Sequence, residues 1–99
     1  MRNGKEKKLE EIKKKALPIL KSNDVVRAGI FGSFARGESK NKSDVDILVK
    51  FKGRKSLFDL ARLEIELEKK IGRKIEVLTY NSLSLLLREI ILKEEVAIL

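Results

Sequence analysis

The sequence predicts one α/β domain in which a small mixed β-sheet is flanked by helices. Its 99 residues are enough for a single hydrophobic core and too few for a second. Segments with apolar residues at helical spacing alternate with short apolar runs rich in β-branched residues. The runs that we expect to be strands are residues 25–31, 44–51 and 74–79. We therefore treat residues 1–99 as one domain.

The first element is predicted to be an amphipathic helix over residues 5–21, with residues 1–5 frayed. Apolar side chains recur at helical spacing among lysines and glutamates, at Leu9, Ile12, Ala16, and Ile19 or Leu20. Residues 22–24, Ser-Asn-Asp, are typical of a turn. Residues 25–31 are apolar and β-branched enough to form a buried strand directly after it.

The next stretch, residues 32–46, reads GSFARGESKNKSDVD and joins the first strand to the second. Asp44 and Asp46 lie two residues apart on the second strand, so their side chains share one face with Cβ atoms about 6–7 Å apart. This arrangement suits Mg²⁺, which takes hard oxygen ligands and is usually completed by water and substrate phosphates. The alternative is a polar turn in solvent. Against that alternative, Asp46 directly precedes Ile-Leu-Val, where an unpaired charge is destabilising.

A phosphate site is predicted beside these carboxylates, where the first strand ends. Residues 33–38 are expected to open a short helix, whose first amides form an anion site. Gly32 permits close approach of the backbone to a phosphate, and the Ser33 hydroxyl can donate to a phosphate oxygen. For Arg36, about one helical turn further along, two interpretations stay open: a phosphate contact and a surface salt bridge.

The second long helix is predicted to follow the turn at residues 53–55. Ser56 and Asp59 have the spacing of a capping box at its start, and Gly72 is placed to end it in the left-handed conformation. Its apolar side consists of Leu60, Leu63, Leu67 and Ile71.

Glu76 is an acidic residue inside the third predicted strand, residues 74–79, among apolar neighbours. If this strand lies beside the strand of Asp44 and Asp46, Glu76 becomes a third carboxylate of the same site. It would then be a metal ligand or the base that takes the proton of an acceptor hydroxyl. The alternative is a surface glutamate on an edge strand.

The last helix is predicted to begin with Asn81 or Ser82 as its N-cap and to run to about Glu94. Its expected core stripe is Leu83, Leu86, Leu87, Ile90 and Ile91. Leu85, Leu92 and the tail at residues 96–99 add more apolar surface than one side of a small sheet needs. Either a protein partner covers the excess, or the helix is broadly buried and the tail is tucked in.

The amino-acid composition limits the kinds of catalytic site, metal site and partner that this chain can have. The chain has no cysteine and no histidine, which excludes disulfides, thiolate or imidazole metal sites, and Ser-His or Cys-His nucleophiles. The net charge of +8 suits an anionic partner. However, 38% of the residues are charged and glutamine is absent, a pattern of proteins from hot environments, which explains many lysines without a ligand. With no membrane-spanning run and no apolar signal segment, we expect a cytoplasmic protein.

These residues also resemble a known family. Gly32-Ser33, ten further residues, and Asp44-Val45-Asp46 look like the glycine-serine-x10-aspartate-x-aspartate signature of the polymerase-beta-like nucleotidyltransferases. The Ala-Arg-Gly within the spacer, the short chain and the leucine-rich end resemble the minimal nucleotidyltransferases. These are the antitoxins of pairs whose toxin is a HEPN-domain ribonuclease. The resemblance begins at about Leu9 and implies the nucleotidyltransferase fold. The family usually has an aspartate where this chain has Glu76.

The resemblance implies an activity and a set of roles. Gly32, Ser33 and Arg36 would bind the phosphates of ATP, and one or two Mg²⁺ ions would be held by Asp44, Asp46 and Glu76. AMP would pass to a tyrosine hydroxyl of the HEPN toxin and silence it. Two alternatives stay open: an antitoxin that acts only by binding its toxin, and a transferase for a small hydroxylated molecule. Direct binding of nucleic acid is not expected.

Overall fold

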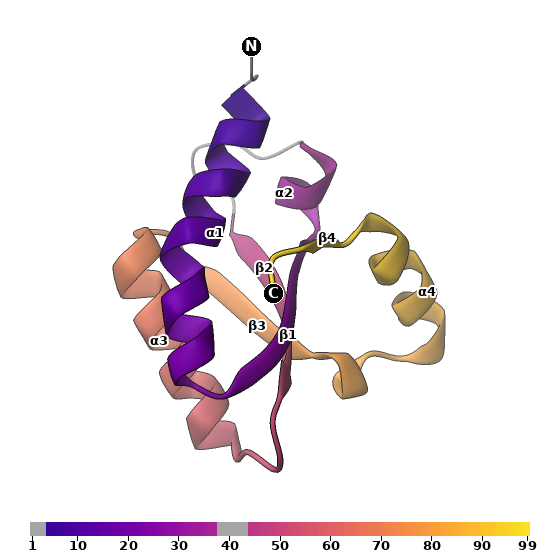
Figure 1. Cartoon of the computed structure of the whole chain (residues 1–99). Helices are drawn as coiled ribbons and strands as arrows, with labels where there is room; N and C mark the ends of the chain where they lie inside the picture. Colours follow the sequence, from indigo (N-terminus) through magenta and orange to yellow (C-terminus); the bar gives the residue numbers. More distant parts are fainter. Residues whose placement is uncertain (1–3, 38–43) are drawn as a thin grey trace.

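The fold is a three-layer α/β arrangement around one four-stranded sheet, as the sequence predicts (Figure 1). The computed structural model describes residues 4–37 and 44–99. The elements, in chain order, are α1 (Gly4–Ser22), β1 (Val25–Phe31), α2 (Ser33–Arg36), β2 (Val45–Phe51), α3 (Leu57–Ile71), β3 (Ile75–Thr79), the 3₁₀ helix η1 (Tyr80–Ser82), α4 (Leu85–Glu94) and β4 (Val96–Ala97).

The sheet has the order β3-β2-β1-β4 and is mixed, as predicted. β1 pairs antiparallel with both β2 and β4, whereas β2 and β3 pair in parallel. The parallel pair is connected through α3, because two parallel strands need a crossover rather than a tight turn. Helices α1 and α3 lie together on one face of the sheet, and α4 lies on the other side (Figure 1).

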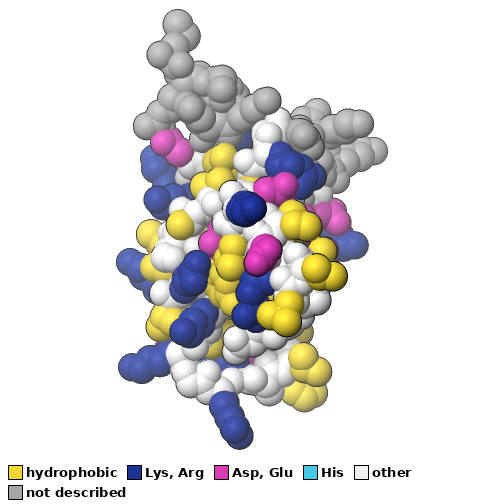
Figure 2. All heavy atoms as spheres, turned by 90° about the vertical axis from the view of Figure 1, so that its right-hand side faces the viewer, with side chains coloured by type: hydrophobic (Ala, Val, Ile, Leu, Met, Phe, Trp, Pro, Cys, Tyr) yellow, Lys and Arg dark blue, Asp and Glu magenta, His cyan; other side chains and the backbone are white. Residues whose placement is uncertain are grey.

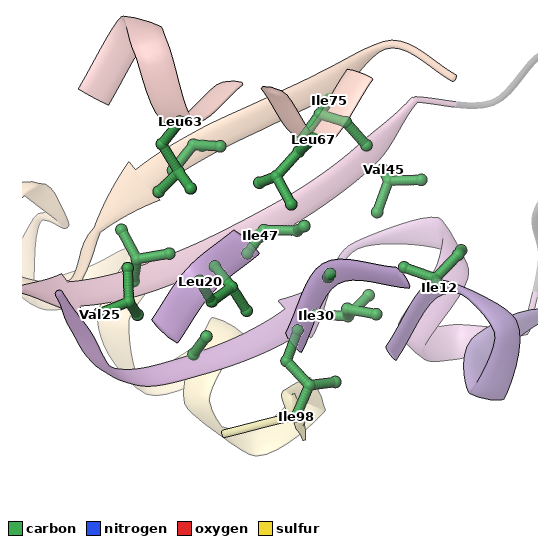
Figure 3. Packing of buried hydrophobic residues seen from close by; sticks show 14 of the residues in the cluster. Ile12, Leu20, Val25, Ile30, Val45, Ile47, Leu63, Leu67, Ile75 and Ile98 are labelled. Atoms are coloured by element: carbon green, nitrogen blue, oxygen red, sulfur yellow. The ribbon is translucent and has the colours of Figure 1, made fainter. Parts of the chain in front are cut away.

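The core lies between the sheet and the pair α1 and α3 (Figure 3). Alternate residues of each strand point to this face, so Val45, Ile47 and Val49 of β2 are fully buried. Helix residues at i and i+4 spacing meet them, including Ala16 and Leu20 of α1 and Leu63 and Leu67 of α3. The intervening strand residues therefore face the α4 side, where the polar residues of interest are found.

The predicted ends of α3 are confirmed. The Ser56 hydroxyl accepts a hydrogen bond from the Asp59 amide, and the Asp59 carboxylate accepts one from the Ser56 amide. Gly72 ends the helix in the left-handed conformation, with φ of +77°. Local capping chemistry thus sets both ends of the helix that returns the chain to β3.

The last helix differs from the prediction. Residues 80–82 form a 3₁₀ turn, so the N-cap is Ser84 rather than Asn81 or Ser82. The expected core stripe is also wrong: Leu83 is buried, but Leu86, Leu87 and Ile90 are 85%, 53% and 57% exposed. The tail, in contrast, is tucked in: β4 pairs with β1, and Ile98 is buried in the core cluster.

Two sequence predictions fall partly outside the described residues. Gly4 and Lys5 belong to α1, and residues 1–3, also expected to be frayed, lie outside the described part of the chain. Residues 38–43, which include the last residue of the short helix predicted at residues 33–38, also lie outside the described part of the chain. Of the helices in the described ranges, none combines the length and apolar character needed to cross a bilayer.

Candidate active site

Three strand ends meet at one edge of the sheet and bring the predicted acidic residues together. Because β2 and β3 are parallel and in register, Asp46 pairs with Glu76. Phe31, at the end of β1, pairs with Asp46 from the other side. Paired residues of neighbouring strands point to the same face, so Asp46 and Glu76 both lie on the face away from α1 and α3. Asp44 is exposed and lies just before β2.

The turn after β1 lies directly against the Asp46 carboxylate. Gly32 has φ of +73°, and a Cβ at this position would collide with Oδ2 of Asp46. Both conditions demand glycine, because other residues rarely adopt this conformation and have no room here. The Gly32 carbonyl accepts a hydrogen bond from the Arg36 amide at 3.1 Å, and Phe34 is buried in the core. The short helix α2, which begins at Ser33, is thereby held beside the carboxylates.

The surroundings of Asp46 disfavour its charge. Burial, followed by repulsion from Glu76, a hydrogen bond with Glu76 and repulsion from Asp44, raises the pKa of Asp46 to about 6. The positive charge of Arg36 acts in the opposite direction. Repulsion from both Glu76 and Asp44 acts on Asp46, so the three acidic groups lie close to one another.

The chemistry of this donor set fits a hard divalent cation. Asp44, Asp46 and Glu76 offer only carboxylate oxygens, which Mg²⁺ prefers. In the described ranges, no three His, Cys, Asp or Glu side chains have the spacing that would hold a metal ion. Asp46 and Glu76 are paired across β2 and β3, and repulsion from Glu76 contributes to the raised pKa of Asp46. A divalent cation would offset this repulsion, so the chemistry of these residues fits the group although the ligand arrangement is not assembled.

Arg36 forms a surface ion pair. Its Nη1 atom lies 3.1 Å from Oε2 of Glu94, the last residue of α4. The alternative of a salt bridge is therefore observed, while a phosphate contact stays a prediction. The same guanidinium lowers the pKa of Asp46, so Arg36 connects the acidic cluster with the end of α4. Sequence reasoning missed Glu94, because no local pattern relates residues 58 positions apart.

A second cluster fixes the tail beside this site. Glu95 accepts hydrogen bonds from the Tyr80 hydroxyl and from Arg27, and the Arg27 guanidinium lies 4.5 Å from the centre of the Tyr80 ring. The Glu95 side chain packs over Gly29, where any larger residue would collide with it. Burial and the bond to Glu95 raise the pKa of Tyr80. This network holds β4 and the end of α4 against β1.

A cavity of about 400 Å³ lies at the opposite end of β2 and β3 and does not coincide with the acidic cluster. Its lining contains Lys50, Arg54 and Lys55 and no carboxylate. The carboxylate chemistry predicted from the sequence is therefore confined to the edge formed by the starts of β2 and β3.

A mixed sheet with carboxylates on adjacent strands, beside a glycine turn, is the arrangement expected of a nucleotidyltransferase. Residues 14–99 match the family described as Polymerase beta, Nucleotidyltransferase, and the chain belongs to that family. A protein of Methanocaldococcus jannaschii named "Putative protein adenylyltransferase MJ0435" is 54% identical over 91 residues, 92% of this chain and 98% of that protein.

Solved structures agree with this assignment. One described as "Structure of putative minimal nucleotidyltransferase" has a TM-score of 0.79 and 35% identity, and the match covers 89% of this chain and 90% of that chain. The fold alone is shared with a chain from a complex of tri-AMPylated Shewanella oneidensis HEPN toxin with MNT antitoxin. There the TM-score is 0.72 at 16% identity, covering 91% of this chain and 71% of that chain. The predicted resemblance to minimal nucleotidyltransferases is confirmed.

Proposed function

We propose that this protein is a cytoplasmic antitoxin that transfers AMP from ATP to a tyrosine hydroxyl of a HEPN ribonuclease toxin. The observation that carries the proposal is the meeting of Asp46 and Glu76, with Asp44 nearby, beside the Gly32 turn. Family membership and a relative named as a protein adenylyltransferase support the reaction class. The fold shared with a chain of the AMPylated toxin complex supports the kind of partner.

In this proposal, the glycine turn and α2 receive the phosphates of ATP. Gly32 exposes its backbone to the β- and γ-phosphates, and Ser33 contributes to the same site. Arg36 can exchange Glu94 for a phosphate oxygen, since an exposed ion pair contributes only about 0–1 kcal/mol. The phosphates would then replace Glu94 as the anionic partner of Arg36.

Asp44, Asp46 and Glu76 would hold one or two Mg²⁺ ions with the triphosphate. Bound Mg²⁺ supplies positive charge that stabilises the charge developing on the phosphate oxygens. Glu76 accepts the proton of the tyrosine hydroxyl as its oxygen attacks the α-phosphorus. The bond between the α-phosphorus and the bridging oxygen breaks, and pyrophosphate leaves with that oxygen. Because burial and repulsion from Glu76 raise the pKa of Asp46 to about 6 before a cation binds, Mg²⁺ should bind more weakly below this pH.

The proposal is tested by incubating the purified chain with ATP, Mg²⁺ and a HEPN ribonuclease, which is sought first in the gene next to its own. The mass of the ribonuclease is then measured by mass spectrometry. We expect mass increases in steps of one AMP and a matching loss of ribonuclease activity. Asp44→Asn combined with Asp46→Asn should abolish both. A matched control is Asp24→Asn, because Asp24 lies at the opposite end of β1 and pairs with Lys55.

The result also separates the alternatives. Neutralisation without any mass increase would establish an antitoxin that acts by binding alone. Release of pyrophosphate from a small hydroxylated compound, with no change in the mass of the ribonuclease, would establish a small-molecule transferase. Transfer that persists in the double variant would contradict the roles assigned to Asp44 and Asp46.

A further inference from the structure

Helix α4 exposes an unusual amount of apolar surface. None of its residues is buried, although three leucines and an isoleucine occur within its first six positions. We call this group the α4 apolar face; it consists of Leu85, Leu86, Leu87 and Ile90, which are 81%, 85%, 53% and 57% exposed. Figure 2, which views the molecule from the α4 side, shows hydrophobic side chains grouped among charged ones. Contiguous apolar surface of this kind commonly marks an interaction site.

The α4 apolar face is connected to the acidic site. Glu94 at the end of α4 pairs with Arg36, whose charge acts on Asp46. Glu95, one residue further, is fixed by Tyr80 and Arg27 against β1. The helix is therefore held at its last turn, beside the catalytic edge, and presents its apolar side chains along the same side of the sheet. The α4 apolar face occupies the first six residues of this helix, which is about 15 Å long, so a protein bound there that extends along α4 would reach the carboxylates at its other end.

Charge and area argue against a second copy as the occupant. Two copies would each bring a net charge of +8, which opposes association. A ten-residue helix is about 15 Å long, and its single apolar face is small against the roughly 800 Å² per partner of a stable interface. An acceptor protein differs from a second copy in charge and in contact area. It need not be basic, and it must also contact the sheet edge that carries the carboxylates. The α4 apolar face and this edge would then form one larger interface.

We propose, resting on the function proposed above, that the α4 apolar face is the docking surface for the acceptor protein. The acceptor would place an apolar surface over Leu86 and Ile90 and its hydroxyl at the carboxylate edge. Docking and chemistry are then carried by different residues of this chain. They can be separated by mutation, since the side chains of Leu86 and Ile90 are exposed and support no core contact.

The test uses the same HEPN ribonuclease as the test of the proposed function. The dissociation constant of its complex with the chain is measured by calorimetry without nucleotide, and the kinetics of AMP transfer are measured next. Leu86→Glu and Ile90→Glu should each weaken binding about tenfold or more, the effect of losing a hot-spot residue. They should raise KM for the ribonuclease more than they lower kcat. Ile65→Glu on α3 is the matched control, because Ile65 is 54% exposed and lies across the sheet. Asp46→Asn should bind normally and transfer nothing. Circular dichroism confirms that each variant is folded.

The outcomes separate this inference from the proposed function. If the wild type transfers AMP while Leu86→Glu and Ile90→Glu bind and react normally, the docking surface is wrong and the function stands. If no AMP is transferred but both variants still lose binding, the function fails and the docking surface stands. A wild-type dimer in light scattering that Leu86→Glu dissociates would show that a second copy occupies the face, and would overturn the inference.

Discussion

Replacing Asp46 by asparagine should stabilise the fold at neutral pH while abolishing activity. The pKa of Asp46 is raised from 3.8 to about 6, so ionisation of this carboxyl opposes folding. At about 1.4 kcal/mol per pKa unit, the opposition is at most about 3 kcal/mol. Since the side chain is partly exposed, solvent screening reduces the expected gain to about 1–2 kcal/mol.

The sign of the pH dependence follows from proton binding. Between pH 3.8 and about 6 the folded state holds a proton that the unfolded state has released. The contribution of Asp46 to stability therefore falls as pH rises through this window and stays low above it. Asparagine has no such dependence. The gain in the free energy of unfolding should be full at about pH 7.5 and should disappear near pH 4.

The assay is urea unfolding followed by far-ultraviolet circular dichroism, without divalent cations, at both pH values. Asp24→Asn is the control, because its carboxylate pairs with Lys55, which lowers the pKa of Asp24. That variant should gain no stability at neutral pH. An Asp46→Asn variant that is less stable than the wild type by the same amount at both pH values would refute the reasoning, because the carboxylate would then not be destabilised by its neighbours.

Three further predictions follow from the same geometry. Millimolar Mg²⁺ should raise the unfolding midpoint of the wild type at neutral pH, since a ligand that binds only the folded state stabilises it. The midpoint of the Asp44→Asn, Asp46→Asn double variant should not change. Equal shifts in the two proteins would contradict the assigned ligands. Gly32→Ala should destabilise the fold by about 1–3 kcal/mol in urea unfolding and abolish transfer, because of the positive φ and the collision with Asp46. Ile98→Ala should destabilise by about 2–5 kcal/mol, whereas a change under about 1 kcal/mol would show that β4 is not docked.

Much of the fold could be predicted from local sequence. The bounds of β1, the capping box of α3 and its end at Gly72 depend on residues a few positions apart, and the structure confirms them. The Gly-Ser and Asp-x-Asp pattern likewise points to the family, because both of its parts are short and can be recognised in the sequence alone.

The tertiary structure decided what depends on distant neighbours. Only the parallel register of β2 and β3 brings Glu76 to Asp46, and only the placement of α4 pairs Glu94 with Arg36. The last helix shows most clearly what the sequence pattern could not predict. Its leucines satisfy helical spacing whether they face a core or solvent, because periodicity describes the helix and not what covers it. The tail pairs with β1 as β4, and the leucine-rich helix is left exposed, with its last residue paired to Arg36.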